Sequence, residues 1–105
     1  MAQNLIQKQL RPSAASLTTL YTVAADMVNS SITVCNTSSV ATTYRIAIRA
    51  LGAAISDVHY IVYDAIIVGN SSECFQLGYT LLATDIVSVY ATLATVNFHL
   101  CGQEK

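Results

Sequence analysis

This chain of 105 residues has few charged side chains: five Lys and Arg and six Asp and Glu, together 10% of its residues. A typical globular domain has about 25%. The net charge of −1 excludes a strong electrostatic grip on nucleic acid or on an anionic membrane. A surface with so little charge suits packing against protein chains better than exposure to water. We therefore expect protein partners, with no nucleic acid and no membrane among them.

Long apolar runs are also missing, although hydrophobic residues make up 53% of the chain. Polar residues interrupt every apolar segment before it reaches the ~18 residues that a spanning helix needs. The N-terminal stretch MAQNLIQKQLRPSAAS lacks the apolar centre of a signal peptide. We expect a protein that is made in the cytoplasm without a targeting segment.

Cysteine and histidine are scarce and show no spacing that indicates a reaction. Cys35, Cys74 and Cys101 are odd in number and far apart, which argues against a disulfide framework and against a zinc site. We expect them to be small apolar filler. His99 lies two residues before Cys101, so a cysteine–histidine dyad is conceivable, but ordinary surface or interface residues are the stronger interpretation. The prediction is no enzyme, with no catalytic residue, no metal ligand and no cofactor.

Alternation of apolar and polar residues, which is typical of β-strands, runs through the chain from residue 16 onward. The clearest case is 42–49, with Tyr44 and Ile46 inward and Arg45 and Arg49 outward. Turn residues separate the segments, and only 50–56 leaves room for a single helical turn. The further strands expected are 16–23, 30–36, 58–68, 73–81, 85–93 and 95–102. This pattern predicts an all-β protein, a single antiparallel β-sandwich of about seven or eight strands, either a jelly roll or an immunoglobulin-like sandwich.

The first fifteen residues stand apart from this pattern. Leu5, Ile6 and Leu10 form either one face of a short helix or the anchor of an extended arm inserted into a neighbour, and a frayed terminus is the alternative. Pro12 separates this segment from the strands. We expect an N-terminal arm at 1–15 and a β-sandwich domain at 16–105, and we expect the fold to survive deletion of residues 1–12.

Two predicted strands, 58–68 and 85–93, are apolar on both faces, and such strands are usually buried on both. In a thin sandwich one face meets solvent unless a partner covers it, so we predict a homo-oligomer. The two arginines of 42–49 either pair with acids across strands or subunits, or form a small anion or sugar-acid patch. The candidate partner-binding residues are Leu5, Ile6, Leu10, Arg45, Arg49, Tyr60, Val62, Val87 and Val89.

Two further residue types have predicted roles. Asp85 follows a turn, where its carboxylate can accept backbone N–H bonds and fix the chain. The six tyrosines fall within strands, which favours core or interface positions over a carbohydrate site, although exposed aromatic rings are common in such sites.

Three segments, LYTVAADMVNSSITVCNTSSVATTYRIAIR, HYIVYDAIIVGNSSECFQLGYTLLATDIVSVYA and VNFHLCGQE, resemble small β-sandwich structural proteins of tailed-bacteriophage virions. The resemblance covers about residues 16–104 and includes no catalytic signature. Ala24-Ala25-Asp26 stands where such proteins often have a Pro-Gly type turn.

The resemblance implies a non-enzymatic virion protein that is made in the host cytoplasm. It implies either capsid cement or decoration, or a neck, tail or baseplate component. A homo-oligomer is expected, with a trimer favoured, and the other partners are virion proteins such as a major capsid or baseplate protein. The alternative function is a carbohydrate- or receptor-binding module of a tail fibre, recognising its ligand through loops 36–42 and 69–73.

Overall fold

Eight strands and two short 3-10 turns make up the regular structure in the computed structural model, which describes residues 4–76 and 81–104. The turns are η1 (Ala50–Gly52) and η2 (Asp57–His59). The strands are β1 (Asn4–Leu10), β2 (Thr18–Thr22), β3 (Met27–Asn36), β4 (Thr42–Arg49), β5 (Tyr60–Ile67), β6 (Ser71–Gln76), β7 (Ile86–Ala91) and β8 (Val96–Glu104). The prediction of an all-β chain with about seven or eight strands is confirmed.

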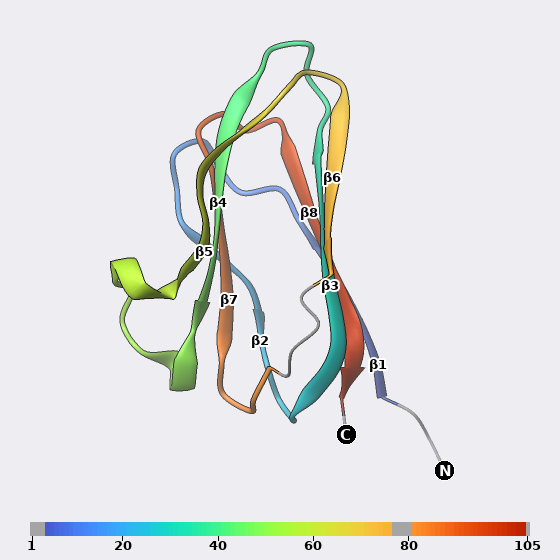
Figure 1. Ribbon diagram of the computed structural model, residues 1–105, viewed down its shortest axis with the longest axis vertical. Helices are drawn as coiled ribbons and strands as arrows, with labels where there is room; N and C mark the ends of the chain where they lie inside the picture. The colour runs from blue at the N-terminus through green and yellow to red at the C-terminus, as the bar shows by residue number, and fades with distance from the viewer. Residues whose placement is uncertain (1–3, 77–80, 105) are drawn as a thin grey trace.

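The strands form two antiparallel sheets that face each other (Figure 1). Sheet A has the order β1-β8-β3-β6, and sheet B has the order β2-β7-β4-β5. The first strand pairs with the last, the second with the seventh, the third with the sixth and the fourth with the fifth. This nested pairing is the strand order of a jelly roll and differs from that of an immunoglobulin-like sandwich.

The core lies between the sheets and is built by the predicted alternation. Ile32 and Val34 of β3 are fully buried, while Thr33 between them points to the outer face of the sheet. Tyr44 of β4 fills the centre, and its ring lies 6.2 Å from the ring of Phe98 and 6.3 Å from that of Phe75. Burial of each such large side chain contributes about 1.5–3 kcal/mol, so the two-residue period of the strands is the main source of stability.

The N-terminal segment differs from its prediction. Residues 4–10 form β1, an edge strand of sheet A that pairs with β8 of the same chain from Asn4↔Glu104 to Leu10↔Phe98. They form neither a helix nor an arm that leaves the sandwich. The boundary expected after residue 15 therefore falls inside the fold. Deletion of residues 1–12 removes a strand and exposes the edge of β8, so we no longer expect the fold to survive it.

Strand β5 also departs from simple alternation. Its pairing with β4 shifts between Tyr44 and Ile46, and Asp64 has a left-handed φ of 53° within this irregularity. Strand β5 therefore contains a β-bulge at Asp64. Residues 58 and 59, expected at the start of this strand, belong to η2 (Asp57–His59) instead. The expected strand 73–81 begins earlier, as β6 from Ser71, and residues 77–80 lie outside the described part of the chain.

Candidate functional site

Val87 and Val89 are misplaced in the predicted partner-binding set. Both side chains are fully buried within the chain, at 0% exposure, because β7 is an interior strand between β2 and β4 and points them at sheet A. The other face of β7 is also well covered: Ser88 is buried, and Ile86 and Tyr90 are half-buried. The two-sided apolar character of 85–93 therefore follows from its central position and requires no partner.

Three other members of the set face the core. Ile6 and Leu10 of β1 and Val62 of β5 are partly buried and pack against the central cluster. Leu5 points the other way and is 71% exposed, so of the three apolar residues of β1 in the set it is the one that offers a contact surface. Tyr60 is half-buried, opposite Ala47 on the outer face of sheet B.

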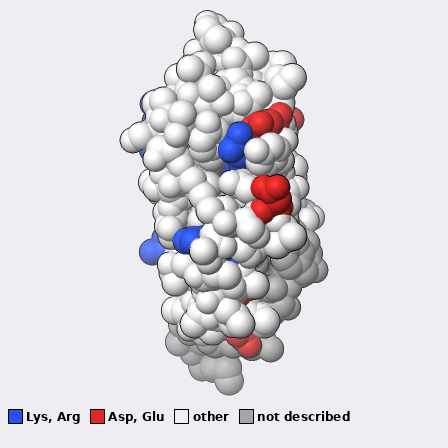
Figure 2. All heavy atoms as spheres, turned by 90° about the vertical axis from the view of Figure 1, so that its left-hand side faces the viewer, with Lys and Arg blue, Asp and Glu red and all other residues white. Residues whose placement is uncertain are grey.

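The main exposed apolar surface follows β5 and the segment that leads into it. We call it the β5 surface. Val58, just before the strand, is 86% exposed, and Ile66, near the end of the strand, is 68% exposed. Figure 2 looks onto this side of the molecule and shows few charged side chains, with a basic and an acidic group side by side in its upper half. The residues of the β5 surface are Leu51, Ile55, Val58, Ile61, Tyr63, Ile66 and Val68.

The bulge decides which residues of the second half of β5 belong to this surface. Ile66 pairs with Thr43, so it lies on the outer face of sheet B, whereas Ala65 and Ile67 pack inward. The bulge at Asp64 reverses the alternation that begins the strand. The run of apolar residues is visible in the sequence, but the face of each residue after the bulge is not.

Arg45 is held in an ion pair on the outer face of sheet B. Its Nε donates to Oδ1 of Asp64 at 2.6 Å, and its Nη2 donates to Oδ2 of the same carboxylate at 3.2 Å. The guanidinium lies 4.3 Å from the ring centroid of Tyr63 and 4.4 Å from that of Tyr90. The hydrogen bond that Arg45 donates to Asp64 is the main cause of the raised pKa of Arg45. Of the alternatives for this arginine, the cross-strand acid pair is the one present, and the paired guanidinium is a poor anion site.

Arg49, four residues along the same strand, forms no ion pair with the residues that the structure describes. It donates to the backbone oxygen of Ala53 at 3.3 Å and is half-buried. This contact fastens β4 to the chain after η1. The two arginines therefore have separate partners and form no joint patch.

The tyrosines divide between the core and the outer face of sheet B. Tyr44 is buried and donates to Glu73 across the sandwich, and burial together with this bond raises the pKa of its hydroxyl. Tyr60 and Tyr63 meet edge to face, with centroids 4.9 Å apart and planes at 80°. With Asp57 they line an open hollow of about 310 Å³. Tyr79 lies outside the described residues.

The three cysteines lie on the outer face of sheet A, which corrects the expectation that they are apolar filler. Cys74 and Cys101 are exposed and Cys35 is half-buried. The Cys101 sulfur lies 3.0 Å from the hydroxyl oxygen of Ser31. Each cysteine lies next to a residue that packs against the core (Val34, Phe75 and Leu100), so the cysteines point to the other side of the sheet. The neighbours on this face are uncharged polar residues, including Gln7, Thr33, Asn97 and His99.

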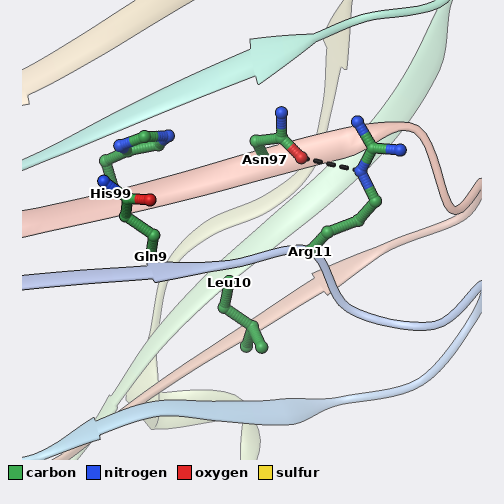
Figure 3. A pocket seen from close by; sticks show the side chains of 5 residues that line it. All are labelled: Gln9, Leu10, Arg11, Asn97 and His99. Atoms are coloured by element: carbon green, nitrogen blue, oxygen red, sulfur yellow. Dashed lines mark hydrogen bonds between the residues drawn. The ribbon is translucent and has the colours of Figure 1, made fainter.

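A second hollow, of about 280 Å³, lies between β1 and β8 on this face. Gln9, Arg11, Asn97 and His99 line it with polar groups, and Leu10 contributes to its floor while its side chain turns to the opposite side of the strand (Figure 3). Arg11 donates from Nε to Oδ1 of Asn97 at 2.7 Å. No sequence pattern points to this site, because the two strands that form it are separated by most of the chain.

The described residues include no cluster with the composition of a metal site. Within 4–76 and 81–104, no group of three or more His, Cys, Asp or Glu is placed to hold a metal ion. His99 and Cys101 share one face of β8, but the described contact of the thiol is with Ser31. No helix in this part of the chain is long and apolar enough to cross a membrane.

No protein-family model matches the chain, and no curated protein matches it either.

Proposed function

We propose that this chain is a non-enzymatic structural protein of a virion, of the tailed-bacteriophage type, that oligomerises and binds other virion proteins. The observation that supports this most strongly is the β5 surface, where seven apolar side chains between residues 51 and 68 are exposed. Exposed apolar residues grouped in this way mark contact surfaces between proteins. The role is capsid cement or decoration, or a neck, tail or baseplate component.

Burial of side chains is the proposed means of binding. Each Å² of apolar surface removed from water contributes about 25 cal/mol, from which the entropy of association is subtracted. β5 is an edge strand of sheet B, so a partner could in principle pair a strand with it. Such pairing is disfavoured, because the bulge at Asp64 makes the backbone of β5 irregular. We therefore expect side chains such as Ile66 and Val58 to be covered by a partner surface rather than by a paired strand.

The partner that we propose first is a second copy of the same chain, with a trimer favoured. Charge repulsion between copies is small because the net charge is −1. The oligomer of this chain in turn binds other virion proteins, such as a major capsid or baseplate protein. The jelly-roll topology is compatible with this role by analogy, since capsid proteins are among the proteins that use it.

Substitutions on the β5 surface test where copies meet. Ile66→Lys and Val58→Lys each place a charge on an exposed position, so neither disturbs the core. We expect both to lower the mass observed by sedimentation velocity relative to the wild-type chain. A matched control is Thr22→Lys, on the exposed side of the opposite edge strand β2, which is expected to leave the mass unchanged.

Two results would count against this location. If both β5 variants sediment as the wild-type chain does, the β5 surface is not the interface. If Thr22→Lys dissociates the assembly and the β5 variants do not, the copies meet along β2 instead.

A further inference from the structure

We propose that the hollow beside Arg11 binds a sugar acid, a hydroxylated ring that carries one carboxylate. This inference is independent of the virion role, since it concerns the outer face of sheet A and not the β5 surface. It rests on the charge of the hollow, on the donors that line it and on the way in which Arg11 is held.

Arg11 keeps its charge uncompensated by the described residues. Its Nε donates to Asn97 and its Nη2 donates to the hydroxyl of Thr37 at 3.0 Å, so both partners are neutral. Arg45, by contrast, is neutralised by Asp64. A guanidinium whose partners are neutral is well suited to bind a carboxylate, because hydrogen bonds between two charged groups are stronger than those between neutral groups.

No carboxylate of the described part of sheet A competes for this guanidinium. Glu73 accepts a hydrogen bond from Tyr44, and Glu104 accepts one from Tyr21. Both tyrosines belong to sheet B, so these carboxylates are turned into the sandwich and away from the outer face. The outer face of the sheet therefore presents a positive charge among uncharged groups.

The guanidinium is also held in place before a ligand arrives. Asn97 fixes one side of it at 2.7 Å, and Thr37, which itself donates to the backbone oxygen of Thr95 at 3.0 Å, fixes the other. The remaining nitrogen, Nη1, makes no hydrogen bond to the described residues. A donor that is already oriented loses little conformational entropy on binding.

The rest of the hollow suits hydroxyl groups. Gln9 and His99 stand side by side on neighbouring strands at one end, and Asn97 and Arg11 stand at the other (Figure 3). Amide and imidazole groups both donate and accept, as sugar hydroxyls do. A hollow of about 280 Å³ is at the small end of ligand sites and suits one ring rather than a chain of rings.

Titration of the isotope-labelled full chain with three probes, followed by amide chemical shifts, tests the proposal. Glucuronate and glucose share a ring and differ at one carbon, where glucuronate has a carboxylate. We expect glucuronate to shift the amides of Gln9, Arg11, Asn97 and His99 in a saturable way, and glucose and acetate to bind at least about tenfold more weakly.

The variant Arg11→Gln is expected to weaken glucuronate binding by about tenfold or more, because it removes the charge-assisted pair. Arg45→Gln is the matched control, and it should bind glucuronate as the wild-type chain does. Thermal unfolding of Arg11→Gln verifies that the exposed substitution leaves the fold intact; should it unfold, His99→Ala replaces it, with a smaller loss of glucuronate affinity expected.

Three results would overturn the proposal. Equal binding of glucuronate and acetate would show a simple anion site without ring recognition. Shifts that survive Arg11→Gln, or that move to Arg45, would place the site elsewhere. The absence of any saturable shift with glucuronate would show that the hollow binds no sugar acid of this class.

Discussion

Arg45 and Asp64 pair across β4 and β5 at the place where the ladder between these strands is interrupted. The Nε–Oδ1 distance is 2.6 Å, and Asp64 occupies the left-handed region at φ 53°. The rings of Tyr63 and Tyr90 flank the guanidinium at 4.3 and 4.4 Å. The bulge, the ion pair and the two rings therefore form one unit that sets the course of β5, and with it the side chains that β5 exposes.

The strength of this pair can be measured by a double-mutant cycle with Arg45→Gln and Asp64→Asn. Asparagine tolerates the left-handed conformation, so the variant removes charge without adding backbone strain. Because both side chains are partly exposed, we expect a coupling energy of about 0.5–1 kcal/mol in urea unfolding. A coupling near zero would show that the pair does not hold the bulge.

Asn36 is predicted to be the most sensitive polar residue of the fold. It is fully buried, and its amide nitrogen donates to the backbone oxygen of Val40 at 2.9 Å. Its Oδ1 accepts from the backbone N–H of Ser38 and from the hydroxyl of Thr95, both at 3.1 Å. Asn36→Ala removes all these bonds from a buried position and leaves their partly buried partners unsatisfied, so we expect a loss of about 2–3 kcal/mol in the free energy of unfolding.

The control for this prediction is Asn97→Ala, since Asn97 lies on the outer face of sheet A and bonds the exposed Arg11. It should lower the free energy of unfolding by about 0.5–1 kcal/mol, because solvent can replace the lost bond. Equal losses for the two variants would contradict the role of Asn36 as a buried junction.

Stability is predicted to fall in alkaline solution. The pKa values of Tyr44 and Tyr21 are raised in the folded chain, by burial first and then by their bonds to Glu73 and Glu104. The unfolded chain releases these protons near pH 10, whereas the folded chain retains them. The folded state thus binds more protons above about pH 10, and the free energy of unfolding decreases as the pH rises.

Urea unfolding at a series of alkaline pH values tests this, with Tyr44→Phe as the comparison. The variant lacks one of the two hydroxyls, so the decrease per pH unit should be smaller than in the wild-type chain. Identical slopes would show that Tyr44 does not contribute to the alkaline loss.

Asp85 is predicted to hold two loops together. Its carboxylate accepts from the backbone N–H of Leu82 at 3.0 Å and from that of Leu51 at 2.9 Å, and it is buried. Asp85→Ala should cost about 2 kcal/mol of unfolding free energy, measured by chemical denaturation. Asp26→Ala, which removes one exposed bond to the N–H of Ala83, should cost less than half as much. A comparable loss in both variants would argue against a special role for Asp85.

Much of the fold could be predicted from local pattern. The strand 42–49 coincides with β4, with Tyr44 and Ile46 buried as expected. The role of Asp85 as an acceptor of backbone N–H bonds is confirmed, because its turn is local and its chemistry depends on near neighbours. Alternation and turn residues specify which segments are strands, and these signals need no knowledge of the distant chain.

The remainder depended on contacts between distant segments. β1 has too few apolar residues to show alternation, and it becomes a strand because the edge of β8 is open to it. The bulge at Asp64 reverses the faces of the residues that follow, so Ile66 is exposed. Val87 and Val89 were assigned to a partner surface because sequence cannot show that β7 is central in its sheet. The Arg11 hollow likewise exists only once β1 and β8 are paired.

The native mass of the purified chain, by size-exclusion chromatography with multi-angle light scattering, tests the central claim most directly. Since the β5 surface exposes apolar side chains that one copy leaves uncovered, we predict a closed trimer or a larger ring at micromolar concentration. A clean monomer at that concentration would contradict self-association and would leave the β5 surface to a different protein.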